Sequence, residues 1–296
     1  MIRETNVKLN LGLQVLRKRP DGYHDLETLF LPYHGYSDTI EIITGDDFSH
    51  TSAALFAKYG EGSVFAHARE DTLAQAISED GKLMITIARA EGVDWEPLDD
   101  LCAKAYRLLA SDYDLPPVKI FVEKKAPVGA GLGGGSADAA FTLGMLNDMF
   151  GLGLPLSPDG SGKTSLSEYA SRLGSDCAFF VFNRPMMGSG RGEVLEPYDI
   201  DLSGYDIQVL VPEGVAVSTK EAYSGVTPQD SGRENLRESL RRPIEKWKDS
   251  VSNDFEPSVF KVHPELSAIK SSLYDSGAVF ASMSGSGSAI FALYRK

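Results

Sequence analysis

Several features that often reveal the class of a protein are scarce in this chain of 296 residues. Only two cysteines are present, Cys102 and Cys177, which favours a reducing compartment, and neither has a CxxC partner, which argues against a zinc site held by the protein. The five histidines show no metal-ligand spacing, so we expect any metal ion to arrive with a nucleotide. No secretory signal opens the chain and no apolar run approaches about 18 residues, so we expect a cytoplasmic protein without a membrane span.

Positive charge is also in short supply. The chain has 29 Lys and Arg residues against 42 Asp and Glu residues, a formal net charge of −13. This acidity disfavours a broad surface for nucleic acid or for an anionic membrane. An anionic ligand would have to be held by backbone N–H groups and a few cationic side chains. We therefore expect a small-molecule substrate. For the oligomeric state, our expectation is a monomer or a weak homodimer.

The most informative segment is rich in glycine and covers residues 127–138, with the sequence PVGAGLGGGSAD. Five glycines fall within residues 129–135, and glycine adopts positive φ angles and lets a ligand approach the backbone closely. Apolar residues at helical spacing follow as far as Phe150, with Ser136 as the expected N-cap and Gly151 as the expected helix end. Alternating residues at 118–123 predict a preceding strand. A strand, a glycine loop and a helix N-terminus favour phosphate binding.

Two other nucleotide-binding motifs fit the glycines less well. The glycines at 129, 131 and 134 satisfy GxGxxG, but no strand with an acidic end follows about 20 residues later, as a dinucleotide site requires. A second cluster at 160–164, GSGKT, is similar to a P-loop, but Ser157 stands where that motif needs glycine. We interpret this cluster as a surface loop with a solvated Lys163.

The rest of the chain mixes strand and helix patterns without a regular β-α-β repeat, which favours an α+β fold. Strands are expected at 7–15, 23–30, 38–44, 118–123, 207–211, 278–283 and 289–294. Helices are expected at 98–109, 139–150, 166–173, 235–247 and 264–274. The segment from about 46 to 80 is polar, rich in alanine and weakly periodic, so we interpret it as an insertion. The pattern resets after residue 197, which predicts domains at 1–197 and 198–296.

Residues 7–15 alternate strictly between apolar and polar side chains. Lys8, Asn10 and Gln14 therefore share one face of the expected strand. From periodicity alone, the favoured interpretation is that the apolar face packs on the core and the polar face is solvated.

Five segments, in order along the chain, resemble the GHMP superfamily of small-molecule kinases. They are KLNL at 8–11, RPDGYH at 19–24, the glycine segment from Pro127 to Ala140, GSD at 174–176 and SGSGS at 284–288. Only about 46–95 looks unlike the superfamily. The resemblance implies a two-domain α+β protein. Its N-terminal domain would be like the second domain of ribosomal protein S5, and its C-terminal domain would be ferredoxin-like.

The first two of these segments narrow the resemblance to members that serve isoprenoid (terpenoid) biosynthesis. It implies transfer of the γ-phosphoryl group of ATP, with Mg²⁺, to the 2-hydroxyl of the methylerythritol moiety of a cytidylyl substrate. The resemblance also implies that Asp176 accepts the hydroxyl proton and that Lys8 lies near it. Taken alone, Asp176 would be interpreted as a cap after Gly174.

The resemblance implies binding residues as well. ATP contacts are expected from Pro127, Val128, Gly129, Ala130, Gly131, Leu132, Gly133, Gly134, Gly135 and Ser136. Substrate contacts are expected from Asn10, Tyr23, His24, Thr219, Tyr223, Gly285 and Gly287. Tyr23 would stack on the cytosine, with Tyr223 on the opposite face, and such stacking is worth about 1–3 kcal/mol per base. Without the resemblance, residues 23–24 could equally be an exposed loop and 284–288 a hairpin turn.

One departure and two alternatives accompany this hypothesis. Asp100 stands where these kinases usually carry an Asn near the adenine, and a carboxylate cannot donate as an amide does. We therefore expect Asp100→Asn to lower the KM for ATP. The alternatives are a GHMP kinase for homoserine, mevalonate or a sugar, and a non-catalytic nucleotide-binding module. The Tyr23–His24 pair argues against the first, and the presence of both Lys8 and Asp176 argues against the second.

Overall fold

The computed structural model describes residues 1–44 and 72–296, which form two compact units. Within this description, unit 1 consists of Met1–Val7, Tyr36–Ala126 and Gly134–Phe182. Unit 2 consists of Lys8–Gly35, Pro127–Gly133 and Asn183–Lys296. Neither unit is a continuous stretch of sequence, so each one is built from segments that lie far apart in the chain.

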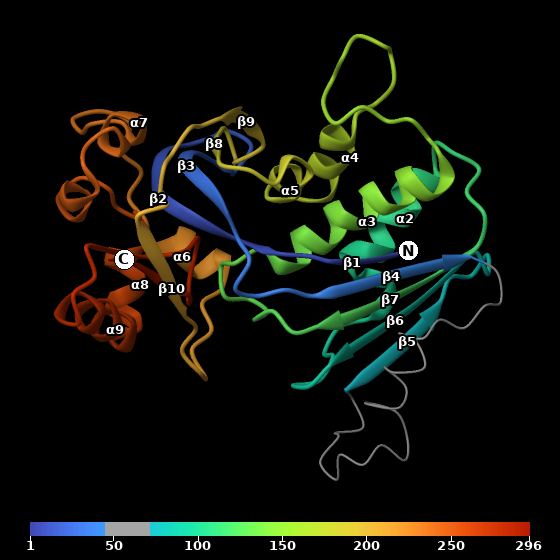
Figure 1. Cartoon of the computed structure of the whole chain (residues 1–296), viewed down its shortest axis with the longest axis horizontal. Helices are drawn as coiled ribbons and strands as arrows, with labels where there is room; N and C mark the ends of the chain where they lie inside the picture. Colours follow the sequence, from blue (N-terminus) through green and yellow to red (C-terminus); the bar gives the residue numbers. More distant parts are fainter. Residues whose placement is uncertain (45–71) are drawn as a thin grey trace. The chain divides into compact units, whose positions relative to one another are not determined.

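Unit 1 contains a five-stranded sheet in the order β1-β4-β7-β6-β5 (Figure 1). The strands are β1 (Ile2–Glu4), β4 (Thr39–Thr44), β5 (Leu73–Ile77), β6 (Leu83–Arg89) and β7 (Val118–Lys124). β6 and β7 run parallel, and the other neighbours run antiparallel. Ile40 pairs with Val122 and Ile42 with Ile120, and all four side chains are fully buried. The alternation at 38–44 and 118–123 therefore marks the face that packs on the core.

Helices cover one face of this sheet, as Figure 1 shows for α2 and α3. The helical segments of unit 1 are η1 (Pro97–Asp99), α2 (Leu101–Ala110), α3 (Gly134–Phe150), α4 (Leu166–Leu173) and α5 (Cys177–Phe182). Leu143 and Leu146 of α3 and Leu109 of α2 are fully buried. Removing each such side chain from water stabilises the fold by about 1.5–3 kcal/mol. A capping box of Ser165 and Glu168 begins α4.

Unit 2 contains two sheets and a set of short helices. The first sheet has the order β2-β3-β8-β9, from β2 (Val7–Lys18), β3 (His24–Tyr33), β8 (Met186–Ser189) and β9 (Val194–Pro197). The second has the order β10-β12-β11, from β10 (Tyr205–Leu210), β11 (Phe280–Met283) and β12 (Ile290–Arg295), with antiparallel pairs. The helices are α6 (Thr219–Gly225), α7 (Leu236–Leu240), η2 (Ile244–Asp249), α8 (Glu256–Val262) and α9 (Pro264–Asp275).

The two faces of β2 do not behave as the alternation predicts. Lys8 and Gln14 are 3% exposed and Asn10 is 2% exposed, so the prediction of a solvated polar face is wrong. Each buried amide has a partner within unit 2: Asn10 donates to Thr28 Oγ1 at 3.0 Å, and Gln14 donates to the Glu234 carbonyl at 3.2 Å. A polar face that is hydrogen-bonded can be buried without a large energetic penalty.

Two further expectations about single elements are wrong. The helix expected at 235–247 is broken, because α7 ends at Leu240 and η2 begins at Ile244. Pro243 lies between them, lacks an N–H group and disfavours helical geometry at the residue before it. Ser136 is not the N-cap of α3, because this helix already begins at Gly134, while it ends before Gly151 as expected.

The segment interpreted as an insertion divides into two parts. Residues 45–71 lie outside the described residues. Residues 73–77 form β5, which pairs with β6, a strand that the sequence patterns did not predict. The apolar run at 177–182 is helix α5. Among the described residues, no helix has the length and apolar character that crossing a membrane requires.

Candidate active site

The glycine segment is divided between the two units. Pro127–Gly133 belongs to unit 2, and Gly134 begins α3 in unit 1. Gly129, Gly131 and Gly133 have φ angles of 72°, 76° and 73°, in the left-handed region that favours glycine. Gly129 and Gly135 are exposed to solvent. The glycine segment with solvent-exposed backbone therefore leads directly into the free N–H groups at the start of α3. Free N–H groups at a helix N-terminus suit an anion such as a phosphate.

The carbonyl of Gly131 is a meeting point of three segments of unit 2. It accepts a hydrogen bond from Lys8 Nζ at 2.9 Å and one from Ser284 Oγ at 3.1 Å. A Cβ atom at residue 131 would lie only 2.2 Å from the Ser284 carbonyl oxygen. Because any side chain would clash there, glycine at this position is required by close packing as well as by its φ angle.

Lys8 and Asn10 lie on the same face of β2 and touch each other. Lys8 Nζ donates to Asn10 Oδ1, and the Asn10 backbone N–H donates to Ser284 Oγ at 3.2 Å. A Cβ atom at Gly285 would lie 3.2 Å from Asn10 Oδ1 and 3.3 Å from Lys8 Nζ. The structure thus brings together four of the predicted site residues, Lys8, Asn10, Gly131 and Gly285, within unit 2.

The turn after β11 is held by Asn253, which the sequence did not assign to the site. Its Nδ2 donates to the carbonyls of Met283 and Gly285, both at 2.8 Å, and its Oδ1 accepts from the Phe255 N–H at 3.0 Å. Gly287, with a φ angle of 92°, completes the same turn. Asn253 therefore also positions the backbone next to Lys8.

The residues expected to bind cytosine lie at the beginning of β3 and in α6. The rings of His24 and Tyr223 are stacked, with centroids 4.8 Å apart and an angle of 22° between their planes. Tyr23 is 56% exposed, and the Arg191 guanidinium lies 5.0 Å from the centre of its ring. Burial, helped by the charge of Lys18, lowers the pKa of His24 below its ordinary value, so this imidazole is neutral at pH 7. Thr219 is exposed at the start of α6.

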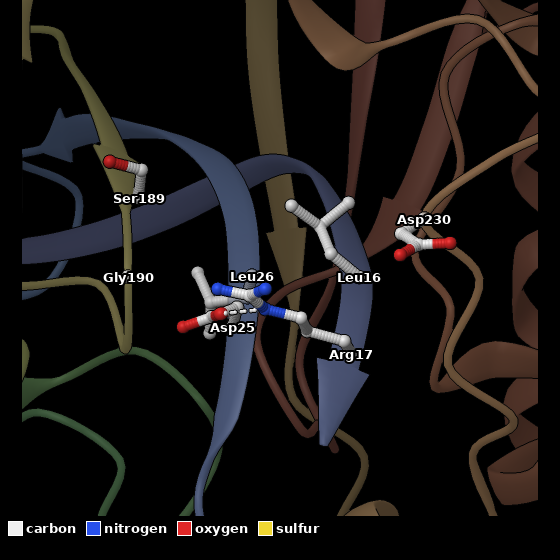
Figure 2. A pocket seen from close by; sticks show the side chains of 7 residues that line it. All are labelled: Leu16, Arg17, Asp25, Leu26, Ser189, Gly190 and Asp230. Carbon is white, nitrogen blue, oxygen red and sulfur yellow. Dashed lines mark hydrogen bonds and ion pairs between the residues drawn. The ribbon is translucent and has the colours of Figure 1, made fainter. Parts of the chain in front are cut away.

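A pocket of about 440 Å³ lies next to strands β2 and β3 (Figure 2). It is lined by Leu16, Arg17, Asp25, Leu26, Ser189, Gly190 and Asp230. Asp25 pairs with Arg17 and with Arg19 Nη1, the latter at 3.0 Å, and these hydrogen bonds lower the pKa of its carboxyl group. The lining of the pocket therefore combines apolar and charged side chains, and two of its residues, Asp25 and Leu26, directly follow Tyr23 and His24 in the sequence.

Asp176 lies in unit 1, immediately before α5, and is half-buried. The next residue, Cys177, is buried, and burial raises the pKa of its thiol to about 12. The nearby Ser136 side chain opposes this rise in the pKa of the thiol, and the Asp176 carboxylate adds to it. Asp176 and the first turn of α3 therefore border the same side chain. Lys8 belongs to unit 2, so its expected proximity to Asp176 stays a prediction.

Asp100 caps α2 and also binds Trp95, and its expected proximity to the adenine stays a prediction. Its Oδ1 accepts from the Cys102 N–H at 2.9 Å and caps α2, and its Oδ2 accepts from Trp95 Nε1 at 3.2 Å. Both oxygens are used, so an Asn here would keep only one of these two acceptors. Among the described residues, no group of three or more His, Cys, Asp or Glu side chains is placed to hold a metal ion.

Comparison with known proteins gives two family matches. The model of the GHMP kinases N terminal domain matches residues 100–184, and the model of the GHMP kinases C terminal matches residues 233–296. A 4-diphosphocytidyl-2-C-methyl-D-erythritol kinase of Bacteroides fragilis is 41% identical over 294 residues, covering 99% of this chain and 92% of the relative.

Solved structures give a consistent result. A crystal structure of a 4-(cytidine 5'-diphospho)-2C-methyl-D-erythritol kinase superposes with a TM-score of 0.69 at 28% identity, covering 99% of this chain and 90% of the other. The homoserine kinase of Cytophaga hutchinsonii has a TM-score of 0.61 at 15% identity, covering 99% and 85%, and so shares the fold alone.

Proposed function

The chain belongs to the GHMP kinase family, and from this membership we propose that it transfers the γ-phosphoryl group of ATP to the 2-hydroxyl of 4-diphosphocytidyl-2-C-methyl-D-erythritol. The products are ADP and the 2-phosphate of the cytidylyl substrate. The reaction belongs to the methylerythritol phosphate pathway of isoprenoid biosynthesis. Full-length similarity to kinases of this name supports the proposal, and the two-domain α+β fold expected from the sequence is confirmed.

The observation that carries the proposal lies in unit 1. Ser136 in the first turn of α3 and Asp176 before α5 both border Cys177. The proposed base for the acceptor hydroxyl, Asp176, therefore lies close to the N-terminal turn of α3, which follows the glycine loop. A phosphoryl-transfer site needs the base and the phosphate-binding backbone close together, because the acceptor oxygen gives up its proton and receives the phosphoryl group.

We assign the phosphates of ATP to the backbone N–H groups of residues 129–135 and to the Ser136 hydroxyl. Positive φ angles at Gly129, Gly131 and Gly133 free the backbone for this contact, and the N-terminal end of α3 favours negative charge. Lys8 brings a buried positive charge to the loop through the Gly131 carbonyl. Preorganised donors and charges of this kind stabilise the charge that spreads over the transferred group.

Asp176 is the proposed acceptor of the substrate hydroxyl proton. In phosphoryl transfer the attacking oxygen forms little bond before the leaving group departs, so a carboxylate is a sufficient base. Mg²⁺ would accompany ATP and neutralise charge on its phosphates, and we assign it no protein ligand.

Tyr23, His24 and Tyr223 are proposed to recognise the cytidine part of the substrate. A neutral imidazole stacked on a tyrosine ring, beside an exposed second tyrosine, offers flat surfaces to a base. Asn10 is proposed to bind the cytidine group together with His24. Gly285 and Gly287 would let their turn approach the substrate or a phosphate closely, and Thr219 is proposed to contact the substrate from α6.

A coupled assay of ADP release with purified protein, ATP and Mg²⁺ tests the function. We expect turnover with the cytidylyl methylerythritol substrate and not with homoserine, mevalonate or galactose. Free CDP should inhibit turnover, because it would occupy the cytidine contacts. Turnover of mevalonate or homoserine without turnover of the cytidylyl compound would assign the chain to another kinase of the family. ATP binding without any turnover would favour a nucleotide-binding module.

A further inference from the structure

Three charged side chains are buried together in unit 1, and the proposed reaction uses none of them. Asp138 is fully buried, Asp38 is 1% exposed and Lys124 is 5% exposed. Taking charges out of water costs several kcal/mol per ion, and the mutual attraction of a buried pair often only offsets this cost. Replacing buried ion pairs by apolar side chains of similar volume is often neutral or stabilising. The cluster therefore calls for a reason other than global stability.

The contacts within the cluster are direct. Lys124 Nζ donates to Asp138 Oδ2 and lies 3.6 Å from Asp38 Oδ2. Thr5 Oγ1 donates to Asp138 Oδ1 at 2.9 Å and accepts from the Asp38 N–H at 3.2 Å. Burial opposes the charge of Lys124, but the carboxylates of Asp138, Asp100 and Asp38 outweigh it and raise the pKa of the ammonium group. Lys124 thus connects the carboxylates of Asp38 and Asp138 through direct ionic contacts.

The cluster joins the two sides of the glycine loop. On the strand side, Asp38 Oδ1 accepts from the backbone N–H groups of Lys125 and Ala126, at 2.6 and 2.7 Å. On the helix side, Asp138 lies at the end of the first turn of α3. A Cβ atom at Gly134 would lie 3.7 Å from both the Ala126 Cβ and Asp38 Oδ2. Asp38 therefore hydrogen-bonds one flank of Pro127–Gly133 and lies close to the other, and Lys124 links it to Asp138 of α3.

We propose that Asp38, Lys124 and Asp138 are positioning residues, which fix the separation and orientation of the two flanks of the phosphate loop and thereby set the affinity for ATP. This inference rests on the proposed function, because it takes residues 129–136 as the ATP site. The cluster contains one cation and two carboxylates, so its charge alone would weaken the binding of an anion. Positioning and charge consequently lead to opposite expectations for a variant that removes a carboxylate.

The first test is Asp38→Ala, which removes one negative charge and leaves two backbone N–H groups without their acceptor. If the cluster positions the loop, the Kd for ATP measured by calorimetry rises about tenfold or more, because the loop loses its fixed flank. The KM for ATP should rise in parallel, while the KM for the cytidylyl substrate and kcat change by less than about threefold. If charge alone matters, ATP binds more tightly, and the proposal is overturned.

Asp38→Asn is the conservative variant. Its amide oxygen can still accept from both N–H groups, although the charge is gone. We expect it to restore most of the ATP affinity that Asp38→Ala loses. Equal loss in the two variants would mean that the acceptor geometry at residue 38 does not determine binding.

Leu109→Ala is the matched control for a loss of stability without a change at the loop. Leu109 is fully buried in α2, eight residues beyond Leu101, which corresponds to about 12 Å along a helix. Leu101 is the α2 residue next to the first turn of α3, because its Cδ1 lies 3.9 Å from the position of a Gly135 Cβ. Leu109→Ala should lower the Tm and leave the Kd for ATP unchanged. If it weakens ATP binding as much as Asp38→Ala, the cluster has only a structural role.

A second variant serves if Asp38→Ala does not fold. Lys124→Met with Asp138→Asn removes the ion pair, and Asp38 keeps the backbone N–H donors of Lys125 and Ala126. We expect a folded protein with a raised Kd for ATP, and unchanged ATP affinity would overturn the proposal. The unmodified protein separates the proposed kinase function from the positioning role of the cluster. If the unmodified protein does not bind ATP, the proposed function is wrong, whatever the variants do. If it binds ATP and turns over, only the variants decide on positioning.

Discussion

Among single side chains, Asp176 carries the chemical step of the proposed reaction. It lies before α5 and next to Cys177, whose thiol also meets Ser136 of α3. Asp176→Asn keeps the size of the side chain and removes its ability to take a proton. We expect kcat to fall by about 10²–10⁴-fold, the range typical of a general base. Steady-state kinetics measure the effect.

Calorimetry with ATP provides the control for Asp176→Asn. ATP binding should be retained, because the substitution affects only the transition state. A near-normal kcat in this variant would remove Asp176 from the reaction. A loss of ATP binding equal to the loss of turnover would place the residue in the nucleotide site instead.

Tyr23 offers a second test on a single side chain. Its ring is 56% exposed, and the contact that we see on it comes from the Arg191 guanidinium. If cytosine stacks on this ring, Tyr23→Ala loses about 1–3 kcal/mol of binding, a rise of about 5- to 150-fold in the KM for the cytidylyl substrate. The KM for ATP should stay constant, and Tyr23→Phe should behave like the unmodified protein. Equal increases in both KM values would contradict the stacking role.

The sequence predicts the identity of the site residues better than their surroundings. Lys8 and Asn10 were assigned through motifs, but periodicity put them on a solvated face, whereas both are buried. The reason is that Thr28 and Ser284, from distant parts of the chain, satisfy Asn10. Alternation reports which residues share a face of a strand, and it contains no information about what covers that face.

On the scale of elements, the glycine loop allows the same substitution to be compared at two positions with similar backbone conformation, Gly129 and Gly131. Gly129 and Gly131 have φ angles of 72° and 76°, so an Ala at either is strained by about 1–2 kcal/mol. They differ in space: a Cβ at Gly129 meets nothing within 4 Å, whereas one at Gly131 lies 2.2 Å from the Ser284 carbonyl oxygen. We therefore expect Gly131→Ala to lower the free energy of unfolding by about 1–3 kcal/mol more than Gly129→Ala.

Urea denaturation of the two glycine variants measures this difference. Because the Ser284 turn would have to move, Gly131→Ala should also raise the KM for the cytidylyl substrate more than Gly129→Ala does. Equal stabilities would show that the turn yields to the added methyl group without strain.

Helices and strands were predictable where local signals agree. The strand at 38–44, the helix at 166–173 and the end of α3 before Gly151 follow from alternation, spacing and a glycine stop. The helix at 235–247 was not, because its apolar spacing continues across Pro243, and the proline ends the helical geometry. β5 and β6 were missed because the pattern of β5 is weak on its own and is supported by pairing with β6, which in turn pairs with β7.

For the whole molecule, the two units are each assembled from separated segments, and β2 shows the consequence within unit 2. The Leu13 N–H donates to the Ser252 carbonyl, and the Asp254 N–H donates to the Leu13 carbonyl, both at 2.9 Å. Leu13 and Val15 are buried in one core with Phe255 and Val259. Residues near the start of the chain are therefore part of the core that the C-terminal segment needs.

This arrangement leads to a prediction about the domain boundary expected at residue 197. A fragment of residues 198–296 would keep α6 to α9 and the sheet β10-β12-β11, but it would lose β2. It would then expose the surface that Leu13 and Val15 cover, where burying each such side chain is worth about 1.5–3 kcal/mol. The loss of two such contacts is a large share of the stability of a domain of about 100 residues, roughly 5–15 kcal/mol.

We therefore expect the fragment 198–296 to show no cooperative unfolding transition by circular dichroism, while the full chain does. Co-expression with residues 1–197 should restore a cooperative transition, because it supplies β2 in trans. The Val15 N–H donates to Asp254 Oδ2 at 2.7 Å, and Gln229 donates to the Val15 carbonyl at 2.9 Å, so the restored complex would also close these backbone contacts. A sharp melting transition from the fragment alone would instead establish residues 198–296 as a domain that folds independently of β2.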